Sequence, residues 1–162
     1  MAEQKIPKII HFCWFGGKEK PSKVQKCIES WHKYLSDYEF MEWNENNFDI
    51  NSNEYVKQAY NEKKFAYVSD YARIKALYQY GGIYMDTDVM VYKSFNDLLD
   101  NQCILGFEEE NYIATSFMAC VPKHELIKKF IDKYENISFY NSDKSIDLTT
   151  NVQRLTHILE DK

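Results

Sequence analysis

The sequence lacks a long hydrophobic run, and this absence excludes a membrane-spanning helix from the prediction. Its longest nearly apolar stretch covers residues 9–15, whereas a helix that crosses a bilayer needs roughly 18 to 20 apolar residues. The N-terminal residues, Met-Ala-Glu-Gln-Lys, also lack the apolar core of a secretory signal. We therefore expect a soluble, cytoplasmic protein, with peripheral association at the inner face of the membrane left open.

Basic residues are not in excess either. The chain has 20 Lys and Arg against 25 Asp and Glu, which gives a formal net charge of −5. Proteins that bind nucleic acid neutralise phosphates with clustered basic side chains, and the basic residues here are scattered. A nucleic-acid partner is therefore not expected.

Several common catalytic and metal-binding signatures are also missing. The four histidines have neither an HxxxH spacing nor a paired cysteine, so a zinc site is not expected. No P-loop, GxGxxG or GxSxG motif occurs, which removes support for dinucleotide binding and for serine nucleophiles. The cysteines have no CxxC spacing and are typical of reduced core thiols. They are Cys13, Cys27, Cys103 and Cys120.

The alternation of strand-like and helix-like segments predicts an α/β fold with an open sheet flanked by helices. Residues 6–15 are typical of a strand buried on both faces, and the helical segment Phe65–Tyr80 ends at a Gly-Gly pair. Further strands are expected at residues 38–43, 83–85, 89–92, 103–107 and 112–121. Further helices are expected after Pro21 and at residues 54–64, 123–134 and 151–159. Without a repeat or linker, residues 1–162 form one predicted domain, and 44% hydrophobic residues suffice for its core.

Two charged side chains stand out in the expected helix at residues 65–80. At about 100° per residue, Asp70 and Arg73 lie near each other, while Lys75 and Gln79 fall on the opposite side. Because the opposite side can face solvent, we interpret Asp70 and Arg73 as directed into the protein or a cleft. The alternative is a surface ion pair worth a few tenths of a kcal/mol.

Asp86 and Asp88 follow a Gly-Gly pair and a short apolar strand. On an extended backbone they would project to one side, roughly 6 to 7 Å apart, and could serve one divalent ion. A carboxylate in apolar surroundings costs several kcal/mol unless it is neutralised, and no basic residue is adjacent in sequence. Mg²⁺ and Mn²⁺ combine one or two carboxylates with substrate phosphates. A solvated turn is the alternative.

Trp14 is expected at the end of the first strand, beside Gly16 and Gly17. Open α/β sheets bind ligands at the carboxyl ends of their strands, so this ring could stack on a flat ligand. A buried core tryptophan is the alternative.

Three motifs in this order resemble the signature of the DXD-containing sugar glycosyltransferases of family 32. They are IPKIIHFCWFGG at residues 6–17, SDYAR at 69–73 and YGGIYMDTD at 80–88. That family includes bacterial capsular and lipopolysaccharide sugar transferases and fungal initiating mannosyltransferases, and it is related to the clostridial glucosylating toxins. The resemblance covers about residues 6–92 and implies a GT-A-like, Rossmann-like mixed sheet.

The resemblance also implies an activity. It would be the transfer of a hexose, with retention of anomeric configuration, from a UDP- or GDP-linked sugar to a hydroxyl of a glycan or lipid-linked glycan. Surface or capsular polysaccharide biosynthesis would be its setting, and Mn²⁺ or Mg²⁺ would be its cofactor. By position, Trp14 would stack on the nucleotide base and Tyr84 would pack near the nucleotide. Asp70 and Arg73 would hold donor sugar hydroxyls and the diphosphate.

For the metal, the resemblance implies that Asp88 is a direct ligand and that Asp86 contacts the ribose or the metal. A divalent ion on the diphosphate would stabilise the charge of the leaving group, and Arg73 would add a permanent positive charge. Asp70, Arg73, Asp86 and Asp88 are therefore the expected catalytic residues.

Relatives of this type usually continue beyond the position of Lys162, with a further metal ligand and a lid over the donor. Thr149-Thr-Asn151 resembles a stretch that precedes that part, so we expect a C-terminally shortened domain. A nucleotide-sugar binding module without turnover is therefore one alternative.

The other alternative is a phosphatase of the haloacid dehalogenase class. Asp86 would be its nucleophile and Asp88 its general acid/base. In that class the acidic motif comes near the start of the core, whereas here about 80 residues of α/β sequence precede it.

Overall fold

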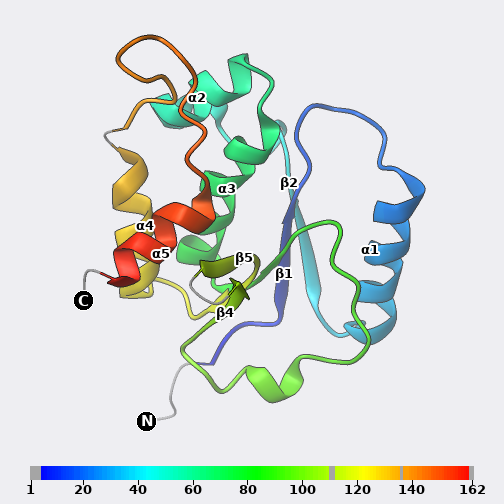
Figure 1. Cartoon of the computed structure of the whole chain (residues 1–162). Coiled ribbons are helices and arrows are strands. Elements are labelled where there is room, and N and C mark those ends of the chain that lie inside the picture. Colours follow the sequence, from blue (N-terminus) through cyan, green and yellow to red (C-terminus); the bar gives the residue numbers. More distant parts are fainter. Residues whose placement is uncertain (1–4, 110–111, 136, 161–162) are drawn as a thin grey trace.

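The computed structural model describes residues 5–109, 112–135 and 137–160. Within these residues, five strands form one mixed sheet in the order β2-β1-β3-β5-β4 (Figure 1). β1 (Ile9–Cys13) pairs in parallel with β2 (Glu39–Trp43) and with β3 (Gly82–Met85). β5 (Tyr112–Cys120) then runs antiparallel to both β3 and β4 (Cys103–Glu109).

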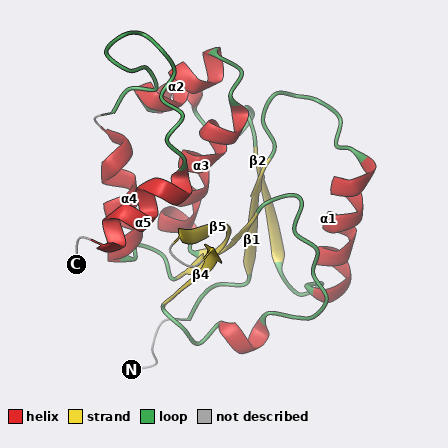
Figure 2. Ribbon diagram, in the orientation of Figure 1, coloured by secondary structure: helices red, strands yellow, loops and turns green. Residues whose placement is uncertain are grey.

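Helices cover both faces of this sheet, as the sequence predicts. Figure 2 shows α1 (Ser22–Tyr34) on one side and the remaining helices on the other. These are α2 (Glu54–Asn61), α3 (Phe65–Tyr80), α4 (Glu125–Glu135) and α5 (Asn151–Glu160). Two short 3₁₀ turns, Ile50–Ser52 and Asn96–Leu98, lie in the connections.

Side chains alternate along the central strands and divide the core into two layers. Ile10 and Phe12 of β1 belong to the layer that packs against Trp31 of α1. Cys13 of β1 and Tyr84 of β3 belong to the opposite layer, which includes most of α3. This two-sided burial is the reason that β1 reads as a nearly continuous apolar run.

The turn from α3 into β3 requires glycine at two positions. Gly81 has a φ of 67°, and a Cβ on it would lie 2.6 Å from Cδ of Pro122. Gly82 has a φ of 114°, and a Cβ on it would lie 2.6 Å from the carbonyl oxygen of Ile9. The glycines therefore allow β3 to lie directly beside β1, which brings the ends of the two strands together.

His11 fastens this turn from inside the core and makes stability depend on pH. Its side chain is fully buried; Nδ1 accepts a hydrogen bond from Nε1 of Trp43 (3.0 Å), and Nε2 lies 2.8 Å from the carbonyl oxygen of Gly81. A neutral ring with its proton on Nε2 satisfies both partners. Burial lowers the pKa of His11 from 6.5 to about 4, against a smaller opposing effect of the bond to Gly81.

We therefore expect the free energy of unfolding to fall by roughly 3 kcal/mol between pH 7 and pH 4 because of His11. Between pH 7 and pH 4, His11 binds a proton in the unfolded chain but stays largely neutral in the folded protein. Urea denaturation at a series of pH values measures the effect, with His11→Gln as the non-titrating comparison. An equally steep pH dependence in that variant would show that other groups are responsible.

The strand predicted at residues 89–92 is wrong. The backbone N–H of Val91 donates to Oγ of Ser30 (2.9 Å), and Nε1 of Trp31 donates to the carbonyl oxygen of Val89 (2.7 Å). Both partners are side chains of α1, so these backbone groups are satisfied without a neighbouring strand. The other predicted strands and helices are present, with their ends shifted by a few residues.

Burial agrees with the prediction of core thiols, since Cys13, Cys27 and Cys120 are buried and unbridged. Within the described ranges, no helix has the length and apolar character needed to cross a lipid bilayer.

Candidate functional site

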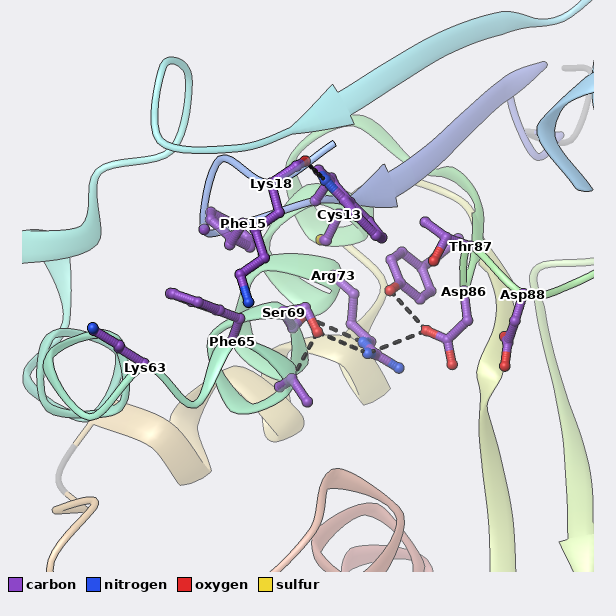
Figure 3. A pocket seen from close by; sticks show the side chains of 14 residues that line it. Cys13, Phe15, Lys18, Lys63, Phe65, Ser69, Arg73, Asp86, Thr87 and Asp88 are labelled. Atoms are coloured by element: carbon purple, nitrogen blue, oxygen red, sulfur yellow. Dashed lines mark hydrogen bonds and ion pairs between the residues drawn. The ribbon is translucent and has the colours of Figure 1, made fainter. Parts of the chain in front are cut away.

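An open cavity of about 770 Å³ lies at the edge of the sheet where β1 and β3 end (Figure 3). Its walls come from residues 13–18, residues 63–73 and residues 84–88. A volume of this size is typical of small-molecule sites. The carboxyl ends of parallel strands are also where open α/β sheets bind their ligands.

Asp86 and Asp88 lie in a tight turn at one side of this cavity. The N–H of Asp86 makes a last bond to the sheet, to the carbonyl oxygen of Ser116 (2.9 Å), and its own carbonyl oxygen accepts from Val89 (3.1 Å). The tripeptide forms a turn rather than an extended strand, because the chain leaves the sheet at Asp86 and turns toward α1. Both carboxylates nevertheless line the cavity, side by side in Figure 3.

Arg73 connects α3, β5 and the acidic turn. Its side chain is only 6% exposed, and Nη1 donates to the carbonyl oxygen of Thr115 (2.7 Å). Nη2 lies 3.4 Å from Oδ1 of Asp70 and 3.3 Å from Oδ1 of Asp86. The guanidinium also lies over the Tyr84 ring, 4.4 Å from its centroid. The helical prediction that Asp70 and Arg73 meet and face inward is confirmed by this geometry.

The two aspartates of the turn differ in how firmly they are held. Oδ1 of Asp86 accepts from the Tyr84 hydroxyl (2.9 Å) as well as facing Arg73. Burial raises the pKa of Tyr84 well above its ordinary value, so this hydroxyl stays a donor. Asp88 is exposed and makes no hydrogen bond or ion pair with the residues that the structure describes. Asp86 is thus fixed in orientation, while the Asp88 carboxylate has no partner among the described residues.

Asp70 lies behind Arg73 and is not one of the residues that line the cavity. Its side chain is 13% exposed, and it accepts a hydrogen bond from the backbone N–H of Asn151, the first residue of α5. Burial raises the pKa of Asp70 to about 6, although Arg73 and the Asn151 N–H lower it. In this arrangement Asp70 supports Arg73, and its predicted contact with a donor sugar stays a prediction.

Trp14 lines the cavity directly after β1. Its indole Nε1 donates to the carbonyl oxygen of Lys18 (2.7 Å), which folds residues 14–18 into a small loop. Nζ of Lys20 lies 5.8 Å from the ring centroid. The ring is therefore held in place at the cavity wall, where a planar group could pack against it.

The lining residues that were not predicted from the sequence include Lys18, Lys63 and Phe65. The signal in the sequence was the glycine at position 16. In the structure its φ is 99°, and a Cβ on it would lie 2.7 Å from the Phe65 ring. This glycine lets the loop after β1 contact the start of α3. Cys13 also lines the cavity, but burial raises its pKa to about 12, so it is not a nucleophile near neutral pH.

The donor set of the acidic turn fits a hard divalent cation. Among the described residues there is no group of three or more His, Cys, Asp or Glu side chains that could form a complete metal site. Mg²⁺ and Mn²⁺ do not need one, because they often combine one or two carboxylates with waters and substrate phosphates. Asp86 and Asp88 supply such carboxylates beside a cavity large enough for the rest.

The structure combines an open α/β sheet with an acidic DXD turn at its ligand-binding edge. Sequence comparison shows which protein family has these features in common with this chain. Residues 21–105, just over half of the chain, match the model described as "Glycosyltransferase sugar-binding region containing DXD motif". The chain belongs to this glycosyltransferase family. The resemblance stated above is thereby confirmed, and the phosphatase alternative gains no support.

Individual relatives agree with this family. Inositol phosphoceramide mannosyltransferase 1 of Schizosaccharomyces pombe is 29% identical over 150 residues, covering 85% of this chain and 44% of the relative. An uncharacterized glycosyltransferase, L373, of Acanthamoeba polyphaga mimivirus is 33% identical over 111 residues, covering 63% and 41%. Human lactosylceramide 4-alpha-galactosyltransferase is 32% identical over 71 residues, covering 41% and 19%. The chain spans less than half the length of these relatives.

A solved structure supports the fold. The structure titled PaToxG glycosyltransferase superposes with a TM-score of 0.66 over 97% of this chain and 70% of that chain, at 18% identity. The predicted α/β, GT-A-like fold is confirmed.

Proposed function

We propose that this protein is a metal-dependent glycosyltransferase that moves a hexose from a UDP- or GDP-linked sugar to an acceptor hydroxyl. The observation that carries the proposal is the position of Asp86 and Asp88. They lie together at the carboxyl edge of the sheet, in a cavity of about 770 Å³ that also contains Arg73 and Trp14. This volume suits a nucleotide sugar.

In this proposal, different residues bind different parts of the nucleotide-sugar donor. Trp14 would pack against the nucleotide base, and Asp86 and Asp88 would hold Mn²⁺ or Mg²⁺. When bound, the ion supplies Lewis-acid stabilisation of the negative charge on the leaving nucleoside diphosphate. Tyr84 and Arg73 both contact Oδ1 of Asp86 and keep this carboxylate oriented before the donor arrives.

Arg73 contributes through a charge that is fixed in place. Its guanidinium is always protonated and is anchored by Thr115 and Asp70. A preorganised positive charge needs no rearrangement when negative charge develops on the leaving group. Asp70 keeps Arg73 in this orientation, and its contact with the donor sugar hydroxyls is proposed from the resemblance to the family alone.

The acceptor and the stereochemistry rest on the family. Two relatives are named for mannose or galactose transfer and for ceramide lipids, which supports a hexose donor and a glycan or lipid-linked glycan acceptor. The resemblance to the family supports retention of anomeric configuration and a part in surface or capsular polysaccharide synthesis. The expected location is the cytoplasm, with peripheral contact at the inner face of the membrane.

Calorimetric titration tests the donor site first. We expect UDP or GDP, and the sugar conjugates of that same nucleotide, to bind in the presence of Mn²⁺ and to lose most of their affinity in excess chelator. The protein without added metal and the non-matching nucleotide are the controls. Absence of binding under every condition would contradict the proposal.

Turnover is measured in a separate experiment, as release of the nucleoside diphosphate from the matching nucleotide sugar. Water and glycans are tested one after the other as acceptors. Binding without release under all of these conditions would favour the nucleotide-sugar binding module.

A further inference from the structure

Lys63 occupies a backbone conformation that favours glycine. Its φ is 57°, in the left-handed region. It follows the C-cap residue of α2, where its N–H donates to the carbonyl oxygen of Tyr60 (2.9 Å) and the N–H of Lys64 donates to that of Ala59 (2.9 Å). These two bonds form a Schellman motif, in which glycine is the usual residue because a Cβ is unfavourable. A strained non-glycine residue at a cavity points to a role for its side chain.

The side chain of Lys63 lines the candidate donor cavity together with that of Lys18. The two residues come from separate segments, the turn before α3 and the loop after β1. Contact between Gly16 and the Phe65 ring brings these segments together. Figure 3 shows Lys18 and Lys63 on one side of the cavity and the carboxylates of the acidic turn on the other.

Neither lysine is neutralised by the protein. Like most lysines in the described ranges, Lys18 and Lys63 form no ion pair with the residues that the structure describes. The lysines with a carboxylate partner are Lys5, Lys8, Lys20 and Lys128. The cavity therefore has uncompensated positive charge at one side and two carboxylates at the other.

We propose that Lys63, assisted by Lys18, binds the diphosphate of the nucleotide donor from the side opposite to Asp86 and Asp88. This inference rests on the proposed function. The diphosphate is the anionic part of a nucleotide sugar; carboxylates repel it unless a cation intervenes, whereas ammonium groups bind it directly. In Figure 3 the end of the Lys63 stem points away from the acidic turn, so Lys63 would meet the diphosphate after rotation about the bonds of its flexible stem. The same charges would stabilise the departing nucleoside diphosphate.

Replacing Lys63 with glycine separates this role from a structural one. Glycine relieves the left-handed backbone and removes the ammonium group, so the melting temperature of the ligand-free protein is expected to rise. The dissociation constant for UDP or GDP with Mn²⁺ is expected to increase about tenfold. A purely structural residue would move stability and affinity in the same direction. Lys63→Arg, which keeps the charge, should retain affinity within about twofold.

Lys144→Gly is the matched control. Lys144 also has a left-handed backbone, with a φ of 70°, but it is exposed and is not a residue of the cavity wall. This variant should gain stability and bind the nucleotide like the wild type. The bare nucleosides, uridine and guanosine, provide a second comparison, because their affinity should not depend on Lys63.

The outcomes separate the two proposals. Wild-type nucleotide affinity in Lys63→Gly would overturn the role of Lys63 while leaving the proposed function in place. Equal losses for the nucleotide and its nucleoside would also overturn it, since the lysine would then not act on phosphate. If the wild-type protein binds neither UDP nor GDP with Mn²⁺, the proposed function itself fails and the inference fails with it.

Discussion

Replacing Asp88 with alanine is expected to abolish Mn²⁺-dependent binding of UDP or GDP while leaving the fold intact. The Asp88 side chain is exposed and has no partner among the described residues, so its loss should change the free energy of unfolding by less than about 0.5 kcal/mol. The metal, in contrast, loses one of two carboxylates that the protein offers. Nucleotide affinity in Mn²⁺ should therefore fall by about a hundredfold or more.

The experiment compares calorimetric titrations in Mn²⁺ and in chelator with thermal denaturation of the same samples. Asp97→Ala is the matched control, because Asp97 is also exposed but lies outside the cavity. If metal-dependent nucleotide affinity is retained in Asp88→Ala, the metal does not bind at this turn. Asp86→Ala should behave differently and lower stability as well, since Asp86 faces Arg73 and accepts from Tyr84.

Much of the fold could be predicted because its central elements carry strong local signals. The apolar run of β1 and the helix Phe65–Tyr80, followed by two glycines, appear where periodicity and stop signals put them. Residues 89–92 carry a strand-like pattern too, but their backbone binds Ser30 and Trp31 on α1. Such partners are distant in sequence, so an apolar run alone does not reveal them.

The candidate site could be predicted in part for a topological reason. β1 and β3 are parallel neighbours, so the residues that follow them meet at one edge of the sheet. Trp14 and the acidic turn line one cavity for this reason.

Other features of the site depend on tertiary contacts and were not predictable. Asp70 accepts from the N–H of Asn151 at the start of α5, and Arg73 donates to the carbonyl oxygen of Thr115 in β5. The left-handed backbone of Lys63 comes instead from the local Schellman motif at the end of α2, which a lysine in place of the usual glycine does not reveal. None of these contacts has a signature in the local sequence.

The buried position of Arg73 leads to the second large effect, which concerns stability and binding together. Replacing Arg73 with lysine is expected to lower the free energy of unfolding by about 3 kcal/mol. Lysine keeps the positive charge, but its single nitrogen cannot contact Thr115, Asp70 and Asp86 at the same time. At least one buried polar group then loses its partner. Because Asp86 also loses its orientation, metal-dependent nucleotide affinity should fall about tenfold or more.

Urea denaturation and calorimetry on the same variant measure the two effects, and Arg154→Lys is the control. Arg154 is the only other arginine of the chain, it is also largely buried, and it pairs with Asp147 at 3.3 Å outside the donor cavity. This control should lose stability yet keep nucleotide affinity within about twofold. If Arg73→Lys were destabilised to a similar degree and still bound nucleotide like the wild type, Arg73 would only hold α3 against the sheet. A loss of affinity in Arg73→Lys alone would instead show that the Arg73 guanidinium contributes to nucleotide binding. Reduced stability could not explain such a loss, because it is expected in both variants.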